Sequence, residues 1–134
     1  MKITWIKQFL AVLAGITMLI SCEYEFIEVS GPKPPDPNDT TNPVDTILFS
    51  TQIEPIFDAA SCTNCHNGGS LKPDLTAGNA YGSIISEGLV VPGDPEASII
   101  YNYPNPYTGS HNTKYSNDQA DLIYLWIFQG AMDN

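Results

Sequence analysis

The chain has 134 residues, of which 15 are acidic and 5 are basic, so its formal charge is −10 at pH 7. A chain this acidic is not expected to bind nucleic acid or anionic lipid through a charged surface. It would suit a basic protein partner, although solubility alone also explains the charge.

Residues 1–21 are typical of an export signal. A start with two lysines precedes an apolar stretch over residues 9–20, which has the length of a signal peptide and is too short to span a bilayer comfortably. Residues 19–22, Leu-Ile-Ser-Cys, resemble the lipobox of bacterial lipoproteins. We therefore expect Cys22 to carry lipid and to become the first residue of the mature chain. An ordinary secretory signal that is cleaved nearby is the alternative.

Residues 22–45 are expected to form a lipidated N-terminus and a disordered tether. Five prolines fall within residues 31–45, and this stretch has no periodic apolar positions with which to offset the entropy of ordering. An extended, polyproline-like chain would hold a folded domain, residues 46–134, away from the membrane. The expected location is therefore extracytoplasmic, on the periplasmic side of a bacterial membrane or at the cell surface.

The folded domain is expected to be all-α. Residues 51–54, Thr-Gln-Ile-Glu, have the pattern of a capping box, and apolar residues recur after it at helical spacing. A first helix is therefore expected to begin near Thr51. A short second helix is expected over residues 80–87, with Gly88 after its end.

Two further helices are expected before the C-terminus. One covers residues 97–101, with Asp94 as its N-cap and with Ile99 and Ile100 facing the core. The last begins at residues 116–119, Ser-Asn-Asp-Gln, a second capping box. Apolar residues on both sides of this helix indicate that it is packed on both sides. Its main buried face is expected to contain Leu122, Ile123, Trp126 and Ile127.

The most specific pattern in the chain is Cys62-Thr63-Asn64-Cys65-His66. This C-x-x-C-H run is typical of c-type haem attachment, in which each thiol adds to one vinyl group of the haem. The following histidine, His66, would then supply an axial imidazole to the iron. With Cys22 assigned to lipid and these two cysteines to haem, none of the chain's three cysteines is left for a disulfide. Haem attachment of this kind occurs outside the cytoplasm, in agreement with the export signal.

Two other interpretations of the cysteine pair are open. Cys62, Cys65 and His66 could bind zinc together with the distant His111, since C-x-x-C is a common half-site for that metal. Adjacent Cys65 and His66 would be awkward as two ligands of one tetrahedral ion. The pair could instead be a redox-active dithiol, although no βαβ pattern surrounds it.

Residues 52–132 resemble a class I c-type cytochrome domain, and are most similar to the small domains of planctomycete-type cytochrome c. The resemblance implies an all-α fold around one covalently attached haem, with His66 as the proximal ligand. It also implies that the first and last helices cross beside the haem. The stretches that carry it are Ile53-Glu54-Pro55-Ile56-Phe57, the C-x-x-C-H run, Val91-Pro92-Gly93-Asp94-Pro95-Glu96-Ala97-Ser98 and Trp126-Ile127-Phe128-Gln129-Gly130-Ala131.

The chain departs from this family at the sixth iron ligand. The family usually supplies a methionine shortly before the last helix, and this chain has none there. We expect His111, five residues before Ser116, to take that position and to give bis-histidine iron. Met132 is the alternative ligand within the folded domain. A solvent-exposed His111, with water or nothing on the sixth side of the iron, is the other possibility.

These observations predict a membrane-tethered, mono-haem c-type cytochrome that carries single electrons to or from an extracytoplasmic redox partner. No catalytic constellation is evident apart from the haem, so the chain is not expected to be an enzyme. The alternatives are a haem accessory module of a partner oxidoreductase, and a zinc-binding structural lipoprotein.

Overall fold

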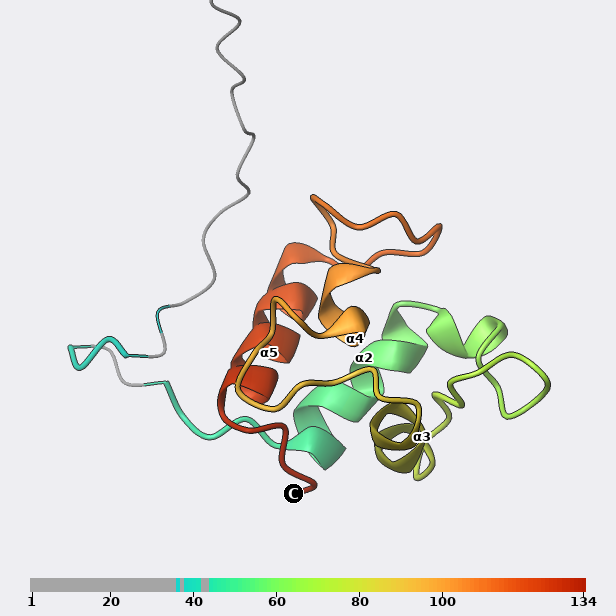
Figure 1. The fold of residues 1–134 in the computed structure, drawn as a ribbon, viewed down its shortest axis with the longest axis horizontal. Helices are drawn as coiled ribbons and strands as arrows, with labels where there is room; N and C mark the ends of the chain where they lie inside the picture. Colours follow the sequence, from blue (N-terminus) through green and yellow to red (C-terminus); the bar gives the residue numbers. More distant parts are fainter. Residues whose placement is uncertain (1–35, 37, 42–43) are drawn as a thin grey trace, which may run out of the picture.

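The computed structural model describes residues 36, 38–41 and 44–134, so the expected export segment, Cys22 and most of the expected tether lie outside the described part. The described residues form helices and no strands, as the all-α expectation requires (Figure 1). None of these helices is both long and apolar enough to cross a membrane. In chain order they are η1 (Phe49–Ile53), α2 (Glu54–Ala59), η2 (Cys62–Asn64), α3 (Ala80–Ser86), α4 (Ile99–Asn102) and α5 (Asn117–Phe128).

The first helix begins at Phe49, earlier than expected. η1 is a π-helical turn that continues into α2, and neither has a side-chain N-cap, so the predicted capping box over residues 51–54 is wrong. Gln52 accepts a hydrogen bond of 2.8 Å from the backbone N–H of Leu48. Phe49 is 2% exposed, and its ring centre lies 5.2 Å from that of Trp126. Burial of the Phe49 ring stabilises the additional turn. The capping pattern over residues 51–54 is local and does not predict a contact with a distant residue such as Trp126.

The last helix, α5, agrees closely with its prediction. Ser116 Oγ accepts from the backbone N–H of Gln119, and Gln119 Oε1 accepts from the backbone N–H of Ser116 at 2.8 Å, which completes the capping box. Leu122, expected on the buried face, is only partly buried. The buried residues of α5 are Ala120, Ile123, Leu125, Trp126 and Ile127.

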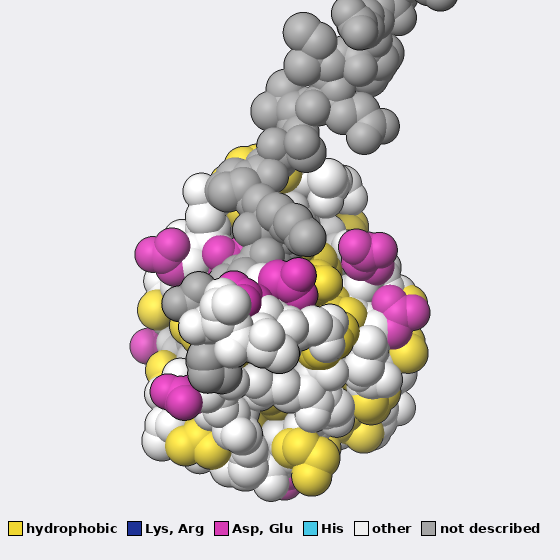
Figure 2. Space-filling model, turned by 90° about the vertical axis from the view of Figure 1, so that its left-hand side faces the viewer, with side chains coloured by type: hydrophobic (Ala, Val, Ile, Leu, Met, Phe, Trp, Pro, Cys, Tyr) yellow, Lys and Arg dark blue, Asp and Glu magenta, His cyan; other side chains and the backbone are white. Residues whose placement is uncertain are grey.

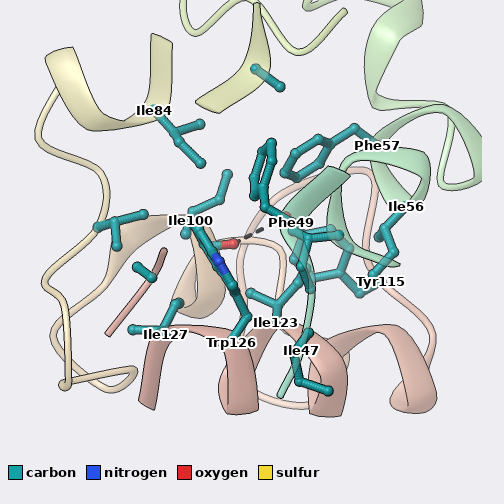
Figure 3. Close-up of a cluster of buried hydrophobic side chains, with 14 of the residues drawn as sticks. Ile47, Phe49, Ile56, Phe57, Ile84, Ile100, Tyr115, Ile123, Trp126 and Ile127 are labelled. Carbon is teal, nitrogen blue, oxygen red and sulfur yellow. Dashed lines mark hydrogen bonds between the residues drawn. The ribbon is translucent and has the colours of Figure 1, made fainter. Parts of the chain in front are cut away.

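The start of η1 and the C-terminus meet at one side of the core. The backbone N–H of Ser50 donates to the carbonyl oxygen of Asn134 at 3.0 Å, and that of Ile47 donates to Gln129 Oε1 at 2.8 Å. Figure 3 shows Ile47, Phe49 and Trp126 together in the cluster that these bonds enclose. The loop of residues 103–115, orange in Figure 1, lies at the end of the fold away from the C-terminus.

Helix α4 begins later than expected, at Ile99, with Ser98 rather than Asp94 as its N-cap. Asp94 Oδ1 accepts instead from the backbone N–H of Ala97 at 3.0 Å, within the turn ahead of the helix. The fully buried Ser98 hydroxyl donates to the Asp94 carbonyl oxygen at 2.8 Å. Ile100 is buried as predicted, whereas Ile99 is 53% exposed, so the prediction that both face the core is wrong. The exposed Ile99 side chain lines a cavity beside the cysteine motif.

Acidic side chains are spread over the face of the molecule where α5 lies (Figure 2). Figure 2 views this face and shows acidic side chains at several places and no lysine among the coloured residues. Burial raises the pKa of Tyr124, on α5, and the charges of Glu96, Asp36 and Asp94 raise it further. Part of the excess of negative charge in the composition therefore lies on this face.

Candidate functional site

A cavity of about 200 Å³ lies where the cysteine motif, residues 72–75, α4 and the loop of residues 103–115 meet. Its wall is mostly apolar, and Lys72 is the one lining residue with a formal charge when histidine is counted as neutral. Leu75, Leu89, Ile99 and Ile100 contribute aliphatic side chains. An apolar cavity with a few polar groups is the usual form of a cofactor site.

The cysteine motif reaches this cavity through a sharp turn after α2. Ser61, at φ 61°, ends that helix in the left-handed conformation that glycine usually supplies. The 3₁₀ turn η2 follows, and the backbone N–H groups of Cys65 and His66 both donate to the carbonyl oxygen of Cys62, at 3.2 and 2.9 Å. This turn brings Cys62 and His66 to the same cavity wall.

His66 is oriented by the segment that passes beside it. Its Nδ1 atom lies 2.9 Å from the carbonyl oxygen of Pro73, and the backbone N–H of Leu75 donates to the His66 carbonyl oxygen at 2.9 Å. A carbonyl oxygen only accepts, so Nδ1 must carry the proton and Nε2 keeps its lone pair. Metal-ligating histidines are commonly held in this way, with the other ring nitrogen donating to a carbonyl oxygen.

His111 lines the same cavity, and its Nδ1 atom also contacts a backbone carbonyl oxygen. Its Nδ1 atom lies 2.7 Å from the carbonyl oxygen of Thr113, and the backbone N–H of Thr113 points to the same nitrogen at 3.2 Å. The two contacts require opposite tautomers, since Nδ1 must carry a proton to donate to the carbonyl oxygen and must lack one to accept from the N–H. The shorter contact favours a protonated Nδ1, which leaves the lone pair of the neutral ring on Nε2. The ring centres of His66 and His111 lie 6.3 Å apart, at an interplanar angle of 36°. The structure thus brings together the two histidines that were predicted as axial ligands.

The two cysteines of the motif differ in their surroundings. Cys62 is 8% exposed and lines the cavity, whereas Cys65 is exposed and is not among the lining residues. Burial raises the pKa of the Cys62 thiol. A redox-active dithiol needs a lowered thiol pKa, so this environment speaks against the dithiol interpretation.

Met132, the alternative axial ligand, lies outside the cavity lining. Its side chain is 60% exposed, and its carbonyl oxygen accepts from the Nε1 atom of Trp126 at 2.9 Å. This bond holds the residue beside the C-terminal end of α5. Cys22, the expected lipidation site, is outside the described residues.

A zinc site needs at least three protein ligands close together. In the described part of the chain, no three His, Cys, Asp or Glu side chains are placed to hold a metal ion. A haem brings its own four nitrogen ligands and needs only one or two from the protein. The two imidazoles, with ring centres 6.3 Å apart, are fewer ligands than a tetrahedral zinc site needs and equal the number that a haem iron could take from the protein.

Sequence reasoning missed the residues that support the two histidines. Pro73 and Thr113 act through backbone carbonyl groups, which leave no residue-type signature in the sequence. Tyr115 was not singled out, although it is 3% exposed, lines the cavity and donates from its hydroxyl to the Ile100 carbonyl oxygen at 3.1 Å. Burial, and to a smaller extent the nearby Cys62, raise the pKa of Tyr115 far above its ordinary value. Its aromatic character and its place just before the last helix were the only signals.

Comparison of the chain with protein-family models, with curated proteins and with solved structures finds no match in any of the three.

Proposed function

We propose that this chain is a mono-haem c-type cytochrome, tethered to a membrane and carrying single electrons to or from an extracytoplasmic redox partner. The observation that carries the proposal is the placement of His66 and His111. Their imidazoles lie on the same cavity, 6.3 Å apart between ring centres, and each has Nδ1 bonded to a backbone carbonyl oxygen. The C-x-x-C-H motif supports the iron of a covalently attached haem as the proposed metal.

The spacing of the two rings supports binding of one metal ion between them. Bonds from imidazole nitrogen to a metal measure about 2.0–2.1 Å. Two imidazoles on opposite sides of one ion therefore have ring centres roughly 6 Å apart. The 6.3 Å between His66 and His111 agrees with this spacing. His66 and His111 are accordingly the proposed axial ligands, and Cys62 and Cys65 the proposed attachment points.

When bound, the haem would supply one-electron redox chemistry, and the protein would set its potential. His66 and His111 would lower that potential relative to a histidine–methionine pair. The aliphatic wall formed by Leu75, Leu89 and Ile100 would exclude water and reduce the local dielectric constant. If His66 and His111 both bound the iron, no open coordination position would remain for a substrate, which would favour electron transfer over catalysis.

The expected tether would determine where in the cell the domain carries electrons. A lipid on Cys22 and the proline-rich residues 31–45 would hold the domain at a membrane while leaving it free to reach a partner. The carboxylates on the face of α5 would suit a partner with a basic surface.

The test is to express the full chain in a bacterial host with cytochrome c maturation and to purify it in detergent. We expect a haem that survives acid–acetone extraction and a low-spin absorbance spectrum. A matched variant with both Cys62→Ala and Cys65→Ala should lose the covalent haem, whereas Cys22→Ala should keep it. A colourless parent protein that binds zinc would overturn the proposal.

A further inference from the structure

We infer that the turn formed by Asn105 and Gly109 is a positioning element that sets His111 in place as the sixth iron ligand. The inference rests on the proposed function, because it concerns how one axial ligand of that haem is held. Nothing in the composition of the loop over residues 103–115 marks these two residues as different from its other polar and small residues.

The buried side chain of Asn105 stabilises the turn over residues 105–109 by hydrogen bonds. Its side chain is 6% exposed, and Oδ1 accepts from the backbone N–H groups of Tyr107 at 2.9 Å and Thr108 at 3.2 Å. Its carbonyl oxygen accepts from the backbone N–H of Gly109 at 3.1 Å. One buried side chain thus satisfies two backbone donors, and its own backbone satisfies a third, which fixes a loop that has no regular secondary structure.

Gly109 leaves no room for a side chain. A Cβ atom there would lie 2.5 Å from the backbone nitrogen and 2.6 Å from the carbonyl oxygen of Asn105, and it would also press against the carbonyl oxygen of Tyr103. These three atoms belong to the backbone and cannot move aside as the end of a flexible side chain could. By contrast, a Cβ atom at Gly82, within α3, would meet nothing within 4 Å.

The same backbone holds His111. The N–H of His111 donates to the carbonyl oxygen of Tyr103 at 3.0 Å, the oxygen against which Gly109 packs. The Tyr103 ring meets the His111 ring edge-on, with centres 5.1 Å apart. On the return side of the loop, the N–H of Tyr115 donates to the carbonyl oxygen of Pro104 at 3.1 Å. Residues 103–105 therefore form a platform that carries both the turn and the ligand.

A methyl group at position 109 must push the turn off this platform. The displacement would carry His111 away from the iron, and a coordination bond of about 2 Å does not tolerate such a shift. The covalent attachments at Cys62 and Cys65 and the axial bond from His66 come from another part of the chain. The haem should therefore stay bound while its sixth position opens.

The experiment compares full-length Gly109→Ala with Gly82→Ala, each produced with attached haem. We expect Gly82→Ala to keep the low-spin spectrum of the parent. Gly109→Ala should lose it, bind carbon monoxide, and recover a low-spin spectrum when imidazole is added. That recovery separates a misplaced ligand from a damaged haem pocket, since only an intact pocket offers the added imidazole an open axial position.

The outcomes separate this inference from the proposed function. A parent protein without haem refutes the proposed function. A haem-loaded parent with a low-spin spectrum that Gly109→Ala leaves unchanged refutes the positioning role alone, as does a variant spectrum that imidazole does not restore. If Gly109→Ala yields no haem-loaded protein, Asn105→Ala, which introduces no clash, is judged by the same three readouts.

Discussion

The Nδ1 atom of His66 lies 2.9 Å from the carbonyl oxygen of Pro73. This bond places the proton of the neutral ring on Nδ1 and limits the rotation of the ring, so Nε2 keeps its lone pair. The Nδ1 atom of His111 lies 2.7 Å from the Thr113 carbonyl oxygen and 3.2 Å from the Thr113 backbone nitrogen, and the shorter contact favours the same tautomer. The two proposed ligands come from segments far apart in the sequence, yet each ring contacts a carbonyl group within seven residues of it. Local backbone structure thus orients each ring, and packing brings the two rings together.

Replacing His111 by alanine should open the sixth position of the iron. We expect the absorbance spectrum to change from low-spin to high-spin, carbon monoxide to bind, and the midpoint potential to rise as one imidazole is lost. Added imidazole should restore the low-spin spectrum. Met132→Leu is the matched control, because Met132 lies outside the cavity lining, and it should leave the spectrum unchanged. A sulfur–iron charge-transfer band in the parent that disappears in Met132→Leu would contradict this assignment.

Removing both motif cysteines should leave the domain without cooperative unfolding. The folded domain is small, and a covalent haem would supply apolar material that its own core lacks. In the Cys62→Ala, Cys65→Ala double variant we expect calorimetry to show no sharp thermal transition near that of the parent. Cys22→Ala should keep the parent's transition, since it removes a thiol outside the domain. A cooperative transition of the double variant at the parent's temperature would count against a structural role for the haem.

The lipid expected on Cys22 should determine whether the protein fractionates with membranes. A diacylated N-terminal cysteine provides two or more acyl chains, which give stable anchoring where one chain does not. The Cys22→Ala variant should therefore appear in the soluble extracytoplasmic fraction with its haem spectrum intact. Equal retention of parent and variant in washed membranes would show that another feature anchors the chain.

The stability of the segment that carries Pro73 should depend on pH through Asp74. The Asp74 carboxylate accepts from the Thr76 hydroxyl at 2.6 Å and from the Thr76 backbone N–H at 3.0 Å. These bonds hold the pKa of Asp74 below its ordinary value of 3.8, and nearby Lys72 adds to the effect. A lowered folded-state pKa contributes stability that is present above the ordinary pKa and is lost as the pH falls through the folded value.

Thr76→Val removes the hydroxyl donor and keeps the backbone donor. We expect the pKa of Asp74, followed by NMR titration of its carboxyl carbon, to rise toward the ordinary value. The melting temperature of the variant should be below that of the parent at neutral pH, and the difference should shrink below pH 3.8. Thr63→Val, which removes a hydroxyl bonded to Asp58 elsewhere on the surface, should leave the Asp74 titration unchanged. A difference in melting temperature that does not depend on pH would exclude this linkage.

The sequence predicted some of these features because their signals are local. The capping box at Ser116 and the apolar spacing of α5 are short-range patterns, and both are present in the structure. The register of η1 depends on contacts with Trp126 and Asn134, more than 70 residues away, so the pattern over residues 51–54 pointed to the wrong start. The C-x-x-C-H run identified His66 as a candidate ligand. Pro73 acts through a carbonyl group that any residue carries, and the need for glycine at position 109 arises from backbone atoms of Tyr103 and Asn105 that only the folded structure places there.

Lys72 should raise the potential of the proposed haem. It is the one charged residue that lines the cavity, and a positive charge near the iron stabilises the reduced state, which carries less positive charge. Lys72→Gln should therefore lower the midpoint potential, by on the order of tens of millivolts, because the exposed side chain is screened by solvent. Lys114→Gln, outside the cavity lining, is the matched control and should have a smaller effect.

The salt dependence separates this charge effect from a structural one. A Coulombic contribution from an exposed lysine should diminish as the ionic strength rises, since the Debye length falls from about 10 Å at 0.1 M to about 3 Å at 1 M. The potentials of the parent and Lys72→Gln should therefore converge in concentrated salt, as measured by spectroelectrochemical titration. A difference that persists at high salt would mean that Lys72 acts by shaping the cavity, through its aliphatic stem beside Pro73, and not by its charge.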